Sequence, residues 1–143
     1  IQKGIDNNQF QTDYFDIITC NPPFFKYIES SNINKNDYKT IARHEIKLNL
    51  NQLFSIAKKL LKNNGVIAIV HRPERFVEVV EEMKKNNIEP KRVQFVYPKK
   101  NMEANIMLIE GSKNGNAGLK ILPPIYSHLD NGEYTEDIKK YFE

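Results

Sequence analysis

The clearest structural signal in the chain is the segment Asp16-Ile17-Ile18-Thr19-Cys20-Asn21-Pro22-Pro23-Phe24-Phe25-Lys26. Its first half is apolar and rich in β-formers, which predicts a strand from Ile17 to Cys20. The strand must stop at Asn21, because proline cannot donate to a sheet ladder and forces the residue before it into an extended conformation. In α/β sheets, ligands bind beyond the carboxyl ends of the strands. Asn21–Phe24 therefore lies where a functional site is expected.

This tetrapeptide suits the transfer of a group to an amino nitrogen that is conjugated with a ring or a carbonyl. Such a nitrogen is a poor nucleophile because its lone pair is delocalised. The side-chain carbonyl of Asn21 and the backbone carbonyl of Pro22 can accept its two N–H bonds and so free the lone pair, while Phe24 stacks on a planar substrate. The alternative is that the prolines only end the strand and that Phe24 belongs to the core.

Composition narrows the class of protein. The 143 residues suit one domain with a modest core. No apolar run reaches about 18 residues, so no membrane span is predicted, and no signal peptide is recognisable. Cys20 is the only cysteine, which excludes a disulfide framework and favours a cytoplasmic protein. The net charge of +3 is weak evidence for any partner.

The region after the first strand predicts a loop and then a long helix. Tyr27–Lys39 is rich in Ser, Asn and Lys without a period, which indicates a loop. Apolar residues then recur with helical spacing over Ile46–Leu61. Asn49 with Gln52 resembles a capping box, and Gly65 fits the position that follows a helix.

The rest of the chain continues with strands and helices in alternation. Val66–Val70 is continuously apolar, as in a strand covered on both faces, and Pro73 suits the first turn of a following helix. This order predicts a parallel sheet with right-handed crossovers. Val93–Tyr97 alternates like a half-exposed strand, and Ala104–Glu110 returns beside it. The sequence thus predicts an α/β fold that closes with an antiparallel strand pair.

Five short motifs support a family resemblance. In chain order they are Asn21-Pro-Pro-Phe-Phe-Lys26, Ala42-Arg-His-Glu45, Leu60-Leu-Lys-Asn-Asn-Gly65, His71-Arg-Pro-Glu-Arg75 and Leu122-Pro-Pro-Ile-Tyr126. The series resembles the tRNA (adenine-N6)-methyltransferase family, whose members methylate the anticodon-adjacent adenine of a valine tRNA. The resemblance covers nearly the whole chain. It implies the C-terminal half of a Rossmann-like class I methyltransferase that uses S-adenosyl-L-methionine, with Asn21, Pro22, Pro23 and Phe24 at the catalytic site.

The chain also departs from the family. Its members bind the cofactor with a glycine-rich turn after the first strand, followed by an acidic residue for the ribose hydroxyls, and the six glycines here form no such turn. We therefore expect residues 1–143 to be the C-terminal part of one methyltransferase domain, with the N-terminal cofactor-binding strands absent. The parent protein would be the enzyme, and this piece alone would be inactive. Its first strand would be an open sheet edge, so we expect self-association.

The resemblance implies further site residues, each with a simpler alternative. Asp6 corresponds to an acidic residue near the cofactor, or it is an ordinary loop aspartate. Arg43 and His44 contact RNA or position the base, or they belong to a solvated start of a helix. His71 and Arg72 follow a parallel strand, where Arg72 contacts phosphate or caps the next helix.

The remaining assignments extend the motif and use the basic residues. Phe25 and Lys26 are assigned to the substrate, and Asn21 is also assigned to the cofactor. A basic strip that attracts RNA, or else a solvated face, is predicted from Lys84, Lys85, Lys91, Arg92, Lys99 and Lys100. Of these, Lys99 and Lys100 are predicted to bind the substrate. The three histidines show no ligand spacing with one another or with Cys20, so no metal is expected.

The predicted function is N6-methylation of a tRNA adenine by direct attack on the cofactor's methyl group. Within the same enzyme class, the alternatives are methylation of rRNA guanine at N2, DNA adenine at N6 or a protein glutamine at N5. The basic strip favours a nucleic acid over a protein substrate. From another class, the chain is a non-catalytic RNA-binding module. No membrane partner is expected.

Overall fold

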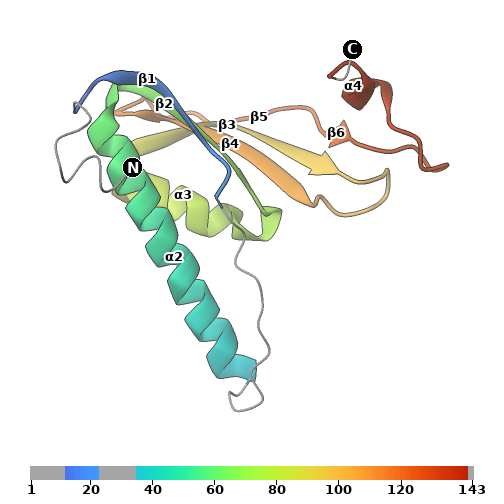
Figure 1. Cartoon of the computed structure of the whole chain (residues 1–143), viewed down its shortest axis with the longest axis horizontal. Helices are drawn as coiled ribbons and strands as arrows, with labels where there is room; N and C mark the ends of the chain where they lie inside the picture. The colour runs from blue at the N-terminus through green and yellow to red at the C-terminus, as the bar shows by residue number, and fades with distance from the viewer. Residues whose placement is uncertain (1–11, 23–34, 142–143) are drawn as a thin grey trace.

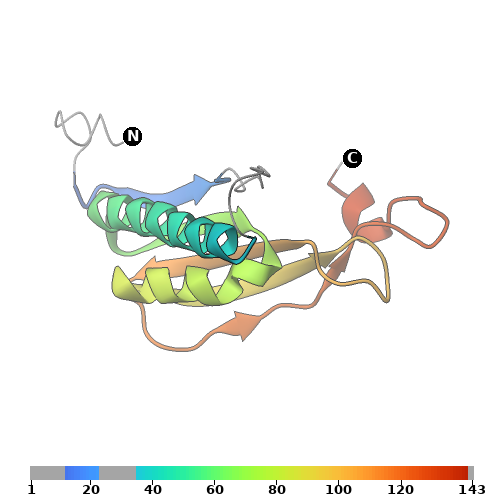
Figure 2. The ribbon, with the colours of Figure 1, turned by 90° about the horizontal axis from the view of Figure 1, so that it is seen from below.

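The structure is a computed structural model that describes residues 12–22 and 35–141. Its elements are β1 (Phe15–Cys20), α2 (Lys35–Leu60), β2 (Leu61–His71), the 3-10 helix η1 (Pro73–Arg75), α3 (Phe76–Lys85), β3 (Ile88–Tyr97), β4 (Ile106–Lys113), β5 (Lys120–Ile121), β6 (Ile125–Tyr126) and α4 (Glu136–Lys139). They form one mixed sheet in the order β1-β2-β4-β3-β5, and β6 also pairs with β3 (Figure 1). The two long helices, α2 and α3, lie on the same face of this sheet (Figure 2).

The strand directions confirm the predicted sheet. β1 and β2 run parallel, with Ile18 opposite Ile67. β4 is antiparallel to both β2 and β3, which is the predicted closing pair. Because β2 and β3 share this antiparallel neighbour, they point the same way as each other and as β1. Cys20, His71 and Tyr97 therefore end three strands at one edge of the sheet, called the carboxyl edge below.

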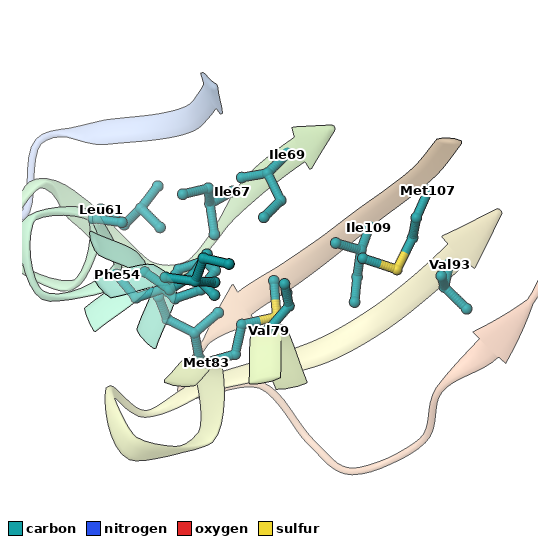
Figure 3. Close-up of a cluster of buried hydrophobic side chains, with 13 residues drawn as sticks. Phe54, Leu61, Ile67, Ile69, Val79, Met83, Val93, Met107 and Ile109 are labelled. Atoms are coloured by element: carbon teal, nitrogen blue, oxygen red, sulfur yellow. The ribbon is translucent and has the colours of Figure 1, made fainter. Parts of the chain in front are cut away.

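The hydrophobic core lies between the sheet and the two long helices (Figure 3). On α2 the residues Ile46, Leu50, Phe54 and Ala57 recur at helical spacing and are all buried, as the sequence pattern predicts. The other core side chains come from α3 and the central strands: Leu61, Ile67, Ile69, Val79, Met83, Ile88, Val93, Met107 and Ile109. This core holds the carboxyl ends of the strands in a defined position.

The predicted boundaries of α2 are wrong at both ends. The helix begins at Lys35, so the last part of the predicted loop is helical, and Asn49 lies in its interior rather than at a cap. Its first turns extend away from the sheet (Figure 1), and Ile46 is the first residue described as buried. An apolar period appears only where a helix packs on a core, which is why this part of α2 gave no signal.

The end of α2 also differs from the prediction. The helix stops at Leu60, and Gly65 lies in β2 instead of terminating the helix. Asn64 is the residue with a left-handed conformation, with a φ of 66°. A Cβ added to Gly65 would lie 2.9 Å from the carbonyl oxygen of Lys62. Glycine is therefore required here for close packing against the turn, not for its backbone freedom.

The prediction that Val66–Val70 is covered on both faces is wrong for the described residues. Ile67 and Ile69 are buried against the helices, whereas Ala68 and Val70 point to the other face and are only half-buried. No helix of residues 12–22 and 35–141 covers that second face (Figure 2). We call it the open face; it also presents Ile17, Thr19, Leu108 and Gln94, which are joined to these residues by strand register.

Candidate functional site

The centre of the candidate site is the end of β1. As predicted, the strand stops at Cys20, and Asn21 and Pro22 follow outside any regular element. Asn21 is exposed and Pro22 is half-buried. The other predicted residues of this motif, Pro23, Phe24, Phe25 and Lys26, lie outside the described residues, and so does Asp6.

Two cavities meet at Asn21. The first, called the α2 cavity, has a volume of about 380 Å³ and lies between the end of β1 and α2; its walls are Cys20, Asn21, Pro22, Ile46, Asn49, Leu50, Leu53 and His71. The second has a volume of about 510 Å³, hollows the open face, and is bordered by Thr19, Asn21, Ala68 and Val70 among others. Asn21 can therefore contact two ligands that approach from opposite faces of the sheet.

His71 is a buried residue that lines the α2 cavity. It is the last residue of β2, and only 7% of its surface is exposed. Its Nδ1 accepts a hydrogen bond from the backbone N–H of Arg72 at 2.9 Å. Burial lowers the pKa of the imidazole, and the nearby Arg75 cation lowers it further. The ring is therefore uncharged at neutral pH, and its proton is on Nε2.

This lowered pKa predicts a pH effect on stability. The unfolded chain binds a proton at His71 at a higher pH than the folded chain, so the free energy of unfolding should fall as the pH drops below about 6.5. The fall should continue until the folded pKa is passed. In the His71→Gln variant this part of the pH dependence should be absent, as measured by urea unfolding between pH 5 and pH 7.5. An unchanged dependence would show that His71 titrates alike in both states.

The other predicted substrate residues lie in different places. Arg72 is exposed at the carboxyl edge and pairs with Glu74 at 3.6 Å. Arg43 and His44 are exposed on α2, inside the helix rather than at its start, and they border neither of the two cavities. The structure thus brings His71 to Asn21 but not Arg43 or His44.

The predicted basic strip is not one surface. Lys99 and Lys100 follow β3 at the carboxyl edge, but Lys84 and Lys85 precede this strand at the opposite edge. A strand of that length separates the two pairs by roughly 30 Å. Ion pairs also engage much of the set: Lys84 with Glu89, Lys85 with Glu82 and Arg92 with Glu110. Of the set, Arg92 borders the 510 Å³ cavity, whereas Lys99 and Lys100 lie at the carboxyl edge and border neither cavity.

Sequence reasoning missed two residues of the site. Asn49 was interpreted as a helix cap, yet it lines the α2 cavity together with Asn21. Its position three residues after Ile46, beside the apolar stripe of α2, was the available signal. Cys20 borders both cavities, and burial raises the pKa of its thiol, so it serves as an uncharged wall.

The described residues offer neither a metal-binding cluster nor a membrane-spanning helix. Within the parts of the chain that the structure describes, no group of three or more His, Cys, Asp or Glu side chains could hold a metal ion. Among the helices of those same residues, none combines the length and the apolar character needed to cross a membrane.

Comparison with solved structures identifies the fold. The chain matches a predicted O-methyltransferase from Agrobacterium tumefaciens with a TM-score of 0.72 and 13% identity, covering 98% of this chain and 56% of that one. It matches M1.HpyAVI, solved as a complex with SAM, with a TM-score of 0.50 and 15% identity, covering 90% and 62%. The chain has the α/β fold of the class I methyltransferases.

Sequence comparison finds relatives whose names give a more specific activity than the fold does. A tRNA1(Val) (adenine(37)-N6)-methyltransferase from Trichodesmium erythraeum is 30% identical over 99% of this chain and 52% of the relative. The enzyme of the same name from Flavobacterium psychrophilum is 27% identical over 71% and 49%. The chain resembles these tRNA methyltransferases. The resemblance predicted from the five motifs is thereby confirmed, although no protein-family model matches the chain. The chain spans about half the length of these relatives.

Proposed function

We propose that this chain carries the catalytic motif of a methyltransferase that uses S-adenosyl-L-methionine to methylate the N6 amine of an adenine in tRNA. The observation that carries the proposal is the position of Asn21–Pro22 at the carboxyl edge, between cavities on opposite faces of the sheet. A methyl transfer requires a donor and an acceptor that meet at one point. The fold and the names of the sequence relatives support the same reaction.

The chain's own groups act on the acceptor amine. The side-chain carbonyl of Asn21 and the backbone carbonyl of Pro22 accept its two N–H bonds, which makes the nitrogen lone pair available for in-line attack. The bound cofactor supplies an electrophilic methyl group on a sulfonium. With the cofactor bound, this methyl group would be transferred from the sulfonium sulfur to the nitrogen, whose excess proton would pass to water. Proximity and orientation then provide most of the acceleration, without a covalent enzyme intermediate.

The residues present offer one side of a cofactor site. Asn21 and the Thr19 hydroxyl border the 510 Å³ cavity, whose volume falls in the range of small-molecule sites, roughly 300–1,000 Å³. The remaining walls of this cavity come mainly from β2, β3 and β4 and are mostly apolar, but they include Gln94 and the Arg92–Glu110 ion pair. The glycine-rich turn that would hold a methionine or ribose moiety is absent from the 143 residues. These residues therefore fit the reacting end of the cofactor and not its whole length.

Methylation assays with the full-length protein test this proposal. Labelled S-adenosyl-L-methionine should transfer its methyl group to bulk tRNA, and the digested tRNA should contain N6-methyladenine. Parallel reactions with rRNA, duplex DNA and a glutamine-containing peptide cover the alternatives. DNA merits inclusion because a putative DNA modification methylase from Thermus thermophilus shares the fold, with a TM-score of 0.55 and 13% identity in its selenomethionine form. Label in rRNA, DNA or peptide alone would contradict the tRNA assignment.

We further propose that the chain is the C-terminal part of one methyltransferase domain, whose remaining part covers the open face. Parallel sheets are normally covered on both faces. Here α2 and α3 cover one face, while the other presents Ile17, Ala68, Val70 and Leu108 to a cavity or to solvent. The relatives have about as many residues again as this chain matches. A second layer of helices from those residues would bury the open face.

This proposal predicts how the isolated chain behaves. Among the described residues β1 pairs only with β2, so its outer edge is open, and Ile17 on this strand is 67% exposed. The isolated chain should self-associate as its concentration rises, and Ile17→Lys should reduce the association because a charge opposes edge pairing. Sedimentation velocity measures both. Val77→Lys is the matched control, since Val77 is 66% exposed but lies on α3. A monomeric wild-type chain, or equal effects of both variants, would contradict edge pairing.

A further inference from the structure

We propose that Asn49 is a specificity-determining residue that reads the ring edge of the acceptor base in the α2 cavity. This inference deepens the proposed function and rests on it. Its starting point is the position of Asn49 in the middle of α2, on the wall that faces Asn21 and Pro22 across the cavity. Among the α2 residues whose side chains the structure describes, no other that borders this cavity is polar.

The α2 cavity is built to hold a flat apolar group with a polar rim. Ile46 and Leu50 are buried and Leu53 is half-buried, so the helix offers an apolar wall. Asn21 and Asn49 are both exposed and line the cavity, one from the segment after β1 and the other from α2. Small-molecule sites have this pattern, with apolar walls and a few polar groups that fix orientation. An unstacked nucleobase has the matching shape and chemistry.

Asn49 has no structural explanation within α2. Asparagine in a helix interior is less favourable than leucine or alanine by roughly half a kcal/mol. Asn51 occupies the same helix, but its side-chain amide donates to Glu82 at 3.0 Å and so links α2 to α3. Among the residues that the structure describes, the Asn49 side chain has no hydrogen-bond partner. Of the two asparagines Asn49 and Asn51, it is Asn49 that borders the α2 cavity. We infer that this amide, which none of the described residues engages, can contact a ligand in the cavity.

An asparagine amide such as that of Asn49, placed beside the amine of the acceptor base, suits adenine as the base. Asparagine recognises adenine through its amine and an adjacent ring nitrogen. If Asn21 and Pro22 accept the two N–H bonds of the amine, the Asn49 N–H₂ group can donate to N1 or N7, the acceptor nitrogens that flank it. The N2 amine of guanine instead has a protonated N1 on one side. A donor aimed at N1 therefore pairs with adenine but meets the N1–H of a guanine bound in the same orientation, whereas N3, on the other side of the guanine amine, is an acceptor.

The experiment uses the full-length protein and short RNA hairpins derived from the RNA that it methylates, with adenine, 1-deazaadenine or 7-deazaadenine at the target. Asn49→Ala should lower kcat/KM for adenine by roughly ten- to a hundredfold, as expected for the loss of one base-specific pair. For the analogue that lacks the contacted nitrogen, the same variant should cause little further loss. Gln52→Ala, an exposed amide on α2 that does not border the cavity, is the control and should leave kcat/KM unchanged.

The outcomes separate the two proposals. An equal fall of kcat/KM on all three hairpins would indicate a structural role and would overturn the specificity role, and so would an unchanged value on adenine. In both cases the wild-type protein still methylates RNA, so the proposed function stands. If the wild-type protein methylates no adenine in any RNA, the proposed function fails and the inference fails with it.

Discussion

Asn21→Ala in the full-length protein should lower kcat for methyl transfer by about 100- to 1,000-fold, the range found when one positioned transition-state contact is removed. The variant loses the side-chain acceptor that orients the amine, while the backbone carbonyl of Pro22 remains. Because Asn21 is exposed and lies outside regular structure, the substitution should change the protein's free energy of unfolding by less than about 0.5 kcal/mol. Single-turnover methyl transfer and urea unfolding provide the two measurements.

Asn116→Ala is a matched control for this prediction. Asn116 is also an exposed asparagine in a loop, but it follows β4 at the edge of the sheet opposite Asn21, and only its backbone carbonyl accepts a hydrogen bond, from Lys91. Its kcat should equal that of the wild type. Normal turnover in Asn21→Ala would end the proposed mechanism, and an equal loss in both variants would point to a general effect on folding.

Phe54→Ala should destabilise the fold by about 3–5 kcal/mol, the usual cost of truncating a buried phenylalanine. Phe54 is fully buried on α2, at the centre of the cluster that joins this helix to the sheet (Figure 3). A cavity there weakens the support of the strand ends that carry the site. Urea unfolding monitored by circular dichroism measures the change in the free energy of unfolding. A loss of stability similar to the wild-type value itself would leave the chain unfolded without denaturant.

Leu48→Ala tests whether this loss reflects the core. Leu48 lies on the same helix but is 50% exposed, so its truncation should cost less than about 0.5 kcal/mol. Phe54→Leu, which retains most of the buried volume, should be clearly more stable than Phe54→Ala. Similar losses in the Leu48 and Phe54 alanine variants would show that the core does not lie where the structure places it.

The sequence was most informative where local chemistry acts alone. The prolines after Asn21 end a strand by their own geometry, so the end of β1 was predictable to the residue. The apolar period of α2 from Ile46 onward and the apolar run in β2 were equally clear, because burial selects those residues directly. The first turns of α2 were not predicted, since they extend away from the sheet (Figure 1) and Ile46 is the first residue of the helix described as buried.

The site required the tertiary structure. The basic residues seemed to form one strip only because they are close in sequence, whereas β3 carries them to opposite edges of the sheet. Asn49 and His71 are distant in sequence from Asn21, and only the packing of α2 against β1 and β2 places all three on one cavity.

The sequence by itself determined the α/β alternation, the end of β1 at Cys20 and the resemblance to tRNA methyltransferases. These depend on local backbone preferences, hydrophobic periodicity and short motifs, which neighbouring residues encode. Only the tertiary structure decided that α2 and α3 share one face, that the other face is open, and that Asn21 stands between two cavities. Those features depend on distances between elements far apart in the chain, and packing of the core sets such distances.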